Sequence, residues 1–229
     1  MKKAIISFVL SLMFPLVLFA DGYTSLWKQY NEAQTKDLPK TQIKILNKII
    51  AQAKAGKSYG NLLKAEFDKV ATASGISDEL FQSELSALKK AAGEASAVDP
   101  ALAAIYNCAL GCSYSLVAKS HYKSDSKKLS REYFDKALAD PEMLASKKAL
   151  DYAPFVREGV DSEIFGNDLL SLVGYYSERY ALLNDYYNKA GNRRASLVTA
   201  LWMLEKRVKA NPVKKVIKGN TYLASLDSL

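Results

Sequence analysis

The sequence predicts an all-α fold, and three observations lead to this prediction. Apolar residues recur at intervals of three and four along most of the chain, which places them on one face of a helix. Gly, Pro, Ser and Asp stand where these stripes begin and end, as helix start and stop signals do. After the first twenty residues, no sustained alternation of apolar and polar residues indicates a strand. With 229 residues and 49% hydrophobic side chains, the chain can bury a substantial core.

Residues 1–20 have the pattern of a secretory signal peptide. Lys2 and Lys3 form a basic start, and residues 4–19 carry no charge. This apolar run is shorter than the roughly 20 residues that a membrane-spanning helix needs, and Pro15 interrupts it. We therefore expect export to the periplasm, the cell envelope or the extracellular space, with no stable membrane span after cleavage.

Four helices are predicted in the first half of the mature chain. Pro39 opens the first and Gly56 closes it, and the second ends before Gly75. Ser77 is the predicted N-cap of the third helix and Asp99 that of the fourth. The four apolar stripes are, in chain order, Ile43, Leu46, Ile50 and Ala53; Leu63, Phe67 and Val70; Phe81, Leu85, Leu88 and Ala92; and Leu102, Ile105, Ala109, Cys112 and Leu116.

The second half begins with two short predicted helices, one ending at Asp140 and one lying before Pro154. A long helix that stops at Gly191 and a further helix that stops at Asn211 follow. Their stripes are Leu169, Val173, Tyr176, Tyr180, Leu183 and Tyr187 on the long helix, and Leu197, Leu201, Leu204 and Val208 on the next.

The polar stretch at residues 123–129 is predicted as a loop between two sets of helical hairpins, 21–122 and 130–229. Helices joined by short connections pack as antiparallel neighbours, so we expect hairpins stacked as a tetratricopeptide-like α-solenoid. The repeat motif itself aligns only in fragments. A compact helical bundle is the alternative architecture.

The end of the chain continues an apolar helical period to its last residue without a closing signal, through Tyr222, Leu223, Leu226 and Leu229. This pattern favours a truncated chain, and a frayed terminal helix is the alternative. Basic residues are densest just before it, at Lys206, Arg207, Lys209, Lys214, Lys215 and Lys218. We interpret them as a solvated helix face, with anionic membrane or glycan contact as the alternative. No nucleic-acid partner is expected in an exported protein.

The sequence offers no catalytic, cofactor-binding or metal site. His121 lies beside a polar stretch and has no metal-ligand companions at a usual spacing. Neither a Gly-x-Ser-x-Gly turn nor a phosphate-binding glycine loop occurs. Cys108 and Cys112 lie one turn apart on a predicted helix, so we interpret them as small buried residues, with a strained disulfide as the alternative. We expect the chain not to be an enzyme.

Fourteen tyrosines suggest a carbohydrate-binding surface, because aromatic rings stack on sugars. The densest group lies on the predicted long helix, at Tyr175, Tyr176, Tyr180, Tyr186 and Tyr187. This helix already needs large apolar side chains for its buried stripe. We therefore interpret the group as core and inter-helix packing, and glycan binding is the alternative.

The N-terminal part of the mature chain resembles the start of exported bacterial alpha-2-macroglobulin-like proteins. The resemblance is carried by Tyr23-Thr-Ser-Leu-Trp-Lys-Gln-Tyr30, Lys36-Asp-Leu-Pro-Lys40, Ile49-Ile-Ala-Gln-Ala-Lys54 and Tyr59-Gly-Asn-Leu-Leu-Lys-Ala-Glu66. It implies a helical region that precedes a series of macroglobulin β-domains in a peptidase-trapping protein. The chain has no room for those domains and lacks the family's thioester motif, so no functional residue is transferred.

The resemblance implies a non-catalytic helical domain that binds or positions a protein, either a peptidase or an envelope protein. The alternative is an independent envelope scaffold that binds a protein partner or a glycan through the grooves of stacked helices.

Overall fold

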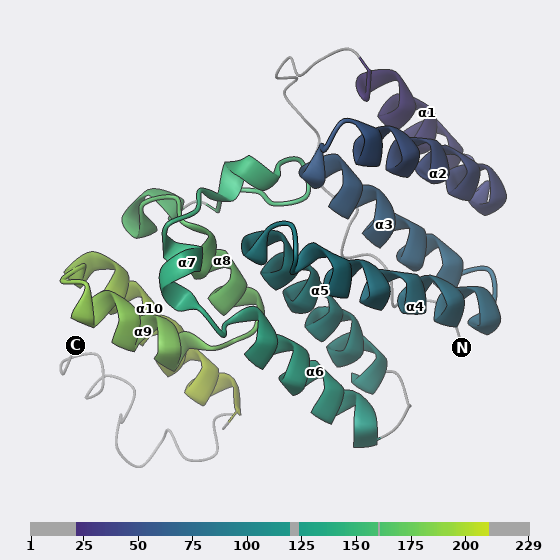
Figure 1. Ribbon diagram of the computed structural model, residues 1–229. Coiled ribbons are helices and arrows are strands. Elements are labelled where there is room, and N and C mark those ends of the chain that lie inside the picture. Colours follow the sequence, from purple (N-terminus) through teal and green to yellow (C-terminus); the bar gives the residue numbers. More distant parts are fainter. Residues whose placement is uncertain (1–21, 120–123, 160, 211–229) are drawn as a thin grey trace. The chain divides into compact units, whose positions relative to one another are not determined.

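A computed structural model of the chain describes residues 22–119, 124–159 and 161–210. It confirms the all-α prediction: these ranges hold ten α-helices and two short 3-10 helices, and no strand (Figure 1). The helices belong to two compact units, Met1–Ala91 with Tyr152–Phe155, and Ala92–Asp151 with Val156–Leu229. We call them unit 1 and unit 2. The solenoid arrangement of the hairpins stays a prediction.

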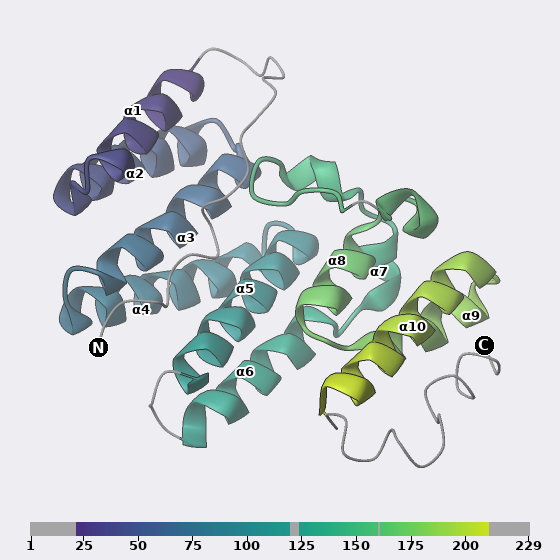
Figure 2. The same ribbon diagram turned by 180° about the vertical axis from the view of Figure 1, so that it is seen from behind.

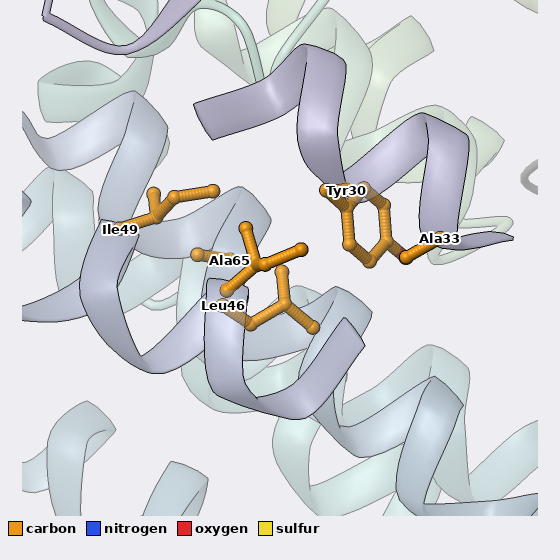
Figure 3. Close-up of a cluster of buried hydrophobic side chains, with 6 residues drawn as sticks. Tyr30, Ala33, Leu46, Ile49 and Ala65 are labelled. Atoms are coloured by element: carbon orange, nitrogen blue, oxygen red, sulfur yellow. The ribbon is translucent and has the colours of Figure 1, made fainter. Parts of the chain in front are cut away.

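Unit 1 contains α1 (Thr24–Thr35), α2 (Pro39–Ala55), α3 (Tyr59–Ser74) and most of α4 (Asp78–Ala95). α2 packs against both α1 and α3. The predicted stripe of α2 is confirmed at Leu46 and Ala53, which are fully buried. The core between these helices is formed by Tyr30, Ala33, Ile45, Leu46, Ile49 and Ala65 (Figure 3).

A short segment from further along the chain completes unit 1. Within Tyr152–Phe155, the ring of Phe155 stacks on that of Phe67 in α3, with centroids 5.0 Å apart. The carbonyl oxygen of Ala153 lies against Gly60 at the start of α3. A Cβ at residue 60 would overlap that oxygen, so glycine alone allows this approach.

Unit 2 contains the remaining helices and all of η1 except its last residue: α5 (Pro100–Lys119), α6 (Ser124–Ala137), α7 (Pro141–Ala145), η1 (Ala149–Tyr152), η2 (Ser162–Phe165), α8 (Leu169–Tyr176), α9 (Tyr180–Lys189) and α10 (Arg193–Ala210). α5 packs against α6 and α8, and α8 also packs against α7 and α9. α9 and α10 form a hairpin, which Figure 2 shows beside α8. The largest buried side chains of this unit include Tyr106, Leu110, Leu144, Leu169, Leu170 and Leu183.

The predicted loop at residues 123–129 is wrong from Ser124 onward, because α6 begins there. The polar stretch forms a helix that packs closely on α5 through small side chains. Ser126 and Ser130 are buried, and the hydroxyl of Ser130 donates a hydrogen bond of 2.8 Å to the carbonyl oxygen of Gly111. Serine therefore takes the buried positions at which an apolar residue is the usual helix signal.

The single long helix predicted from Leu169 to Tyr187 is also wrong, because the chain reverses between α8 and α9. Glu178 adopts a left-handed backbone with φ 54°, and no Gly or Pro marks the break. The reversal brings Leu183 against Gly174, where a Cβ would lie 2.5 Å from the leucine side chain. Leu169, Leu183 and Tyr187 are buried as predicted, but Tyr176 is exposed.

Four helix connections share one hydrogen-bond geometry, the Schellman motif. In each, a residue with positive φ follows the helix, and the next N–H donates to the carbonyl five residues back at 2.9 Å. The donor and acceptor residues are Leu38 and Ala33, Ser58 and Ala53, Arg179 and Gly174, and Asn192 and Tyr187. The residues with positive φ are Asp37, Lys57, Glu178 and Gly191. The same short turn thus joins α1 to α2, α2 to α3, α8 to α9, and α9 to α10.

The predicted stripe of α10 is wrong at two positions. Leu197 and Val208 are exposed, whereas Ala195 and Thr199 are fully buried. The small side chains of Ala195 and Thr199 allow α9 and α10 to pack closely. The side-chain amide of Asn184 in α9 donates a hydrogen bond of 3.1 Å to the hydroxyl of Thr199. This contact requires the two helices to lie close together.

Two predicted helix caps are confirmed. The hydroxyl of Ser77 accepts from the N–H of Leu80 at 3.2 Å, and the carboxylate of Asp99 accepts from the N–H of Ala101 at 3.0 Å. The predicted signal peptide, His121 and the apolar period at Tyr222–Leu229 lie outside the described residues.

Candidate functional site

Unit 2 carries a continuous group of aromatic rings from η2, α8, α9 and α10. We call it the aromatic cluster, and its members are Phe165, Tyr175, Tyr176, Tyr180, Tyr186, Tyr187 and Trp202. Trp202 of α10 lies at its centre, with ring centroids 5.3 Å from Phe165, 5.0 Å from Tyr175 and 5.7 Å from Tyr180. The hairpin between α8 and α9 brings these rings together, since one continuous helix would separate them.

The aromatic cluster runs from the core of unit 2 to its surface. Phe165 and Tyr187 are buried, whereas Tyr175 is 45% exposed and Tyr176 is 52% exposed. The ring of Tyr175 contacts the partly buried Trp202, which in turn contacts the buried Phe165. Exposed rings held by such contacts lose little conformational freedom when a partner covers them. The exposed end is therefore a preorganised surface.

The buried end is fixed by Asp168, the N-cap of α8. Its carboxylate accepts from the N–H of Ser171 at 2.8 Å and from the hydroxyl of Tyr187 at 2.7 and 2.9 Å. Burial raises the pKa of Asp168, and these hydrogen bonds act against the rise. Burial and the neighbouring Asp168 charge raise the pKa of Tyr187. The pair connects the start of α8 to α9.

The exposed rings do not form a flat platform. The planes of Tyr175 and Tyr176 meet at 83°, and those of Tyr175 and Trp202 meet at 66°. The nearly parallel pair in the aromatic cluster is Phe165 with Trp202, at 24°, and Phe165 is buried. A sugar ring therefore finds no pair of coplanar exposed rings here.

Charged groups of both signs border the exposed end. Lys206 pairs with the Glu178 carboxylate at 2.8 Å, and its ammonium lies 5.6 Å from the centroid of Tyr180. Arg179 pairs with Asp135 at 2.5 Å. An aromatic centre with a polar rim is the composition of protein interfaces.

Cys108 and Cys112 lie on α5 beside the last turn of α8. The thiol of Cys108 is buried and lies 3.8 Å from the carbonyl oxygen of Val173. The thiol of Cys112 is partly exposed and lies 3.9 Å from the carbonyl oxygen of Tyr176. Both cysteines are free, and the interpretation as small buried residues is confirmed for Cys108 alone.

In unit 1, the aromatic residues of α1 are used in packing. The indole N–H of Trp27 donates to the side-chain oxygen of Asn61 at 2.7 Å. Lys64 lies 4.5 Å from the Trp27 ring centroid and pairs with Asp68 at 2.5 Å. Tyr30 is buried, and burial raises its pKa. These contacts join α1 to α3.

The sequence prediction identified five tyrosines of the aromatic cluster and interpreted them as packing, with glycan binding as the alternative. The structure brings all five together but exposes two of them. Phe165 and Trp202 were missed, because they lie on other elements and no sequence spacing connects them to the tyrosines. Among residues 22–119, 124–159 and 161–210, no group of three or more His, Cys, Asp or Glu side chains could hold a metal ion.

Comparisons with protein-family models, curated proteins and solved structures find no match to this chain. None of the helices in the described ranges combines the length and the apolar character that a membrane crossing requires.

Proposed function

We propose that this chain is a non-catalytic, exported helical domain that binds a protein partner through the exposed end of the aromatic cluster. The observation that carries the proposal is the exposure of Tyr175 and Tyr176, together with the contact that holds Tyr175 against Trp202. Tyr and Trp are the residue types that contribute most to binding energy at protein interfaces. Neighbouring exposed rings are a feature of interaction surfaces.

A protein partner fits this surface better than a glycan. Stacking of a sugar requires the open face of a ring, and the exposed rings of Tyr175 and Tyr176 stand almost perpendicular to each other. Perpendicular rings suit an irregular surface with pockets, which a protein offers. The mixed charges of Lys206, Glu178 and Arg179 at the border suit a polar interface rim.

The resemblance to alpha-2-macroglobulin-like proteins suggests what the partner is. As part of a peptidase-trapping protein, the domain binds a peptidase or an envelope protein and positions it for the β-domains. As an independent envelope scaffold, the chain holds an envelope protein instead. The same surface serves in both settings, so its test does not depend on the choice between them.

Site-specific photo-crosslinking tests the proposal. We would place p-benzoylphenylalanine at residue 175 or 176 in the cells that produce the protein, and at Leu150 as a control. Leu150 is 54% exposed and lies outside the aromatic cluster, so it matches the exposure of Tyr176. We expect a discrete protein adduct from positions 175 and 176 and none from position 150.

Two results would overturn the proposal. Adducts of equal yield at all three positions would show nonspecific contact. Saturable binding of an envelope glycan to the purified chain, lost in Tyr176→Ala and retained in Leu150→Ala, would replace the protein partner with a glycan.

A further inference from the structure

The two cysteines form a dithiol pair with unequal environments. They are four residues apart on α5, so their side chains lie on successive turns of one helix face. Each thiol lies against a carbonyl oxygen in the last turn of α8. Cys108 is buried, whereas Cys112 is partly exposed. A reagent from solvent therefore reaches Cys112 first.

The same arrangement gives the two sulfur atoms different acidities. The hydrogen bond from Cys108 lowers the pKa of Cys112, while burial acts against this effect. The hydrogen bond with Cys112 and its own burial raise the pKa of Cys108. The more accessible sulfur is thus also the better source of thiolate, which is the form of cysteine that reacts.

We propose that Cys112 is a site of reversible mixed-disulfide formation with small disulfides such as glutathione disulfide, and that Cys108 resolves the adduct. The Cys112 thiolate attacks one sulfur of the small disulfide, whose S–S bond breaks, and the other half leaves as a thiolate that takes a proton from water. Cys108 then loses its proton to solvent and attacks the sulfur of Cys112. The second small thiol leaves and is protonated, so that two protein thiols are oxidised while one small disulfide is reduced to two thiols.

The geometry of α5 makes this product reversible. Residues four apart on an α-helix have Cα atoms about 6 Å apart, near the long end of the range for disulfides. A disulfide held near that limit is strained, and strained disulfides are reduced more readily than structural ones. This thiol chemistry does not depend on the proposed protein partner.

Intact-mass spectrometry and peptide mapping of the full chain test the proposal. Reduced wild-type protein, Cys108→Ser and Cys112→Ser are each treated with glutathione disulfide under native conditions and quenched in acid. We expect wild type to lose two hydrogen atoms and retain no glutathione. Cys108→Ser should retain one glutathione on Cys112, and Cys112→Ser should react at least about tenfold more slowly, because only the buried thiol remains.

Folding of each variant is checked by circular dichroism, and the same reaction in denaturant serves as the reference. Modification of Cys112→Ser at the rate of Cys108→Ser in the folded proteins would overturn the assignment of Cys112 as the first site. Wild type that keeps glutathione as stably as Cys108→Ser would overturn the resolving role of Cys108. Should both thiols react in denaturant alone, the site is closed in the native fold and the proposal fails.

Discussion

The hydroxyl of Tyr187 lies 2.7 Å from one carboxylate oxygen of Asp168 and 2.9 Å from the other. Asp168 also caps α8 through the N–H of Ser171. One buried carboxylate thus fixes both the start of α8 and the deep end of the aromatic cluster. The positions of Tyr175 and Tyr176 depend on a contact that solvent does not reach.

Replacement of Tyr187 by Phe should make the free energy of unfolding fall less steeply as the pH rises above about 10. Because the folded pKa of Tyr187 is raised, folded protein keeps this proton while the unfolded chain releases it near pH 10, about the value for free tyrosine. The stability contribution is therefore complete below about pH 10 and is lost as the pH rises further. Urea unfolding from about pH 8 to pH 11 measures the slope, with Tyr175→Phe as the exposed control. An unchanged slope in Tyr187→Phe would contradict this assignment.

Asp168→Asn tests the acidic side. The folded pKa of Asp168 is raised, chiefly by burial, so its contribution to stability is complete below about pH 4 and is lost as the pH rises through the folded value. Asn cannot ionise and keeps an oxygen for the N-cap. We expect the variant to gain stability relative to wild type from about pH 4 to pH 7 in urea titrations. A relative gain by wild type over this interval would mean that the carboxylate is stabilised in the fold.

Gly111→Ala should destabilise unit 2 by about 1–3 kcal/mol, because a Cβ at this position would lie 2.5 Å from the ring of Phe134 in α6. Gly93 provides the matched control. It lies within helix α4, and a Cβ there meets nothing within 4 Å, so Gly93→Ala should stabilise by about 0.5–1 kcal/mol. Denaturant midpoints of the two variants should move in opposite directions. A shift in the same direction would mean that α5 and α6 lie further apart.

Substitution of the residue with positive φ should have opposite effects on stability in two of the four shared turns. Lys57 has φ 52° and is exposed, so Lys57→Gly removes the cost of a left-handed residue and should stabilise by up to about 1 kcal/mol. Gly191 has φ 73°, and a methyl group there would meet open space, so Gly191→Ala should destabilise by about 1 kcal/mol through the backbone alone. Thermal unfolding of both variants checks the pair. Equal shifts of one sign would mean that the turns differ.

The chain should not inhibit peptidases by itself. Residues 22–119, 124–159 and 161–210 form helices and turns, and these ranges hold no β-domain that could enclose a peptidase. A panel of peptidases, each incubated with a stoichiometric amount of the purified chain, should keep full activity toward a protein substrate. Clear inhibition of any of them would mean that the helical domain acts on peptidases directly.

Sequence periodicity predicted most of the helices correctly, but it failed where small or ordinary residues carry the structural signal. Ser126 occupies a buried position of α6, but it is polar and lies in the polar stretch at residues 123–129, which suggested a loop. The break after α8 depends on Glu178 in a left-handed conformation, which nothing in the residue type indicates. Leu197 is expected to be buried by spacing, although the close packing of α9 and α10 selects Ala195 and Thr199.

The aromatic cluster was only partly predictable for a related reason. Tyr175, Tyr176 and Tyr180 are near one another in sequence, so their grouping was visible. Their exposure depends on the reversal at Glu178, and their support comes from Trp202, more than twenty residues away along the chain. Spacing along one helix carries no information about such a contact.

The attachment of Tyr152–Phe155 to α3 determines when unit 1 can complete its folding during synthesis. While the ribosome is still making α6, the surface of α3 around Gly60 and Phe67 lacks a piece of chain that does not yet exist. Unit 1 can close only after synthesis has passed Phe155, when several helices of unit 2 still lie ahead. Any attempt to express unit 1 as a contiguous fragment that stops at α4 will lack this closing segment.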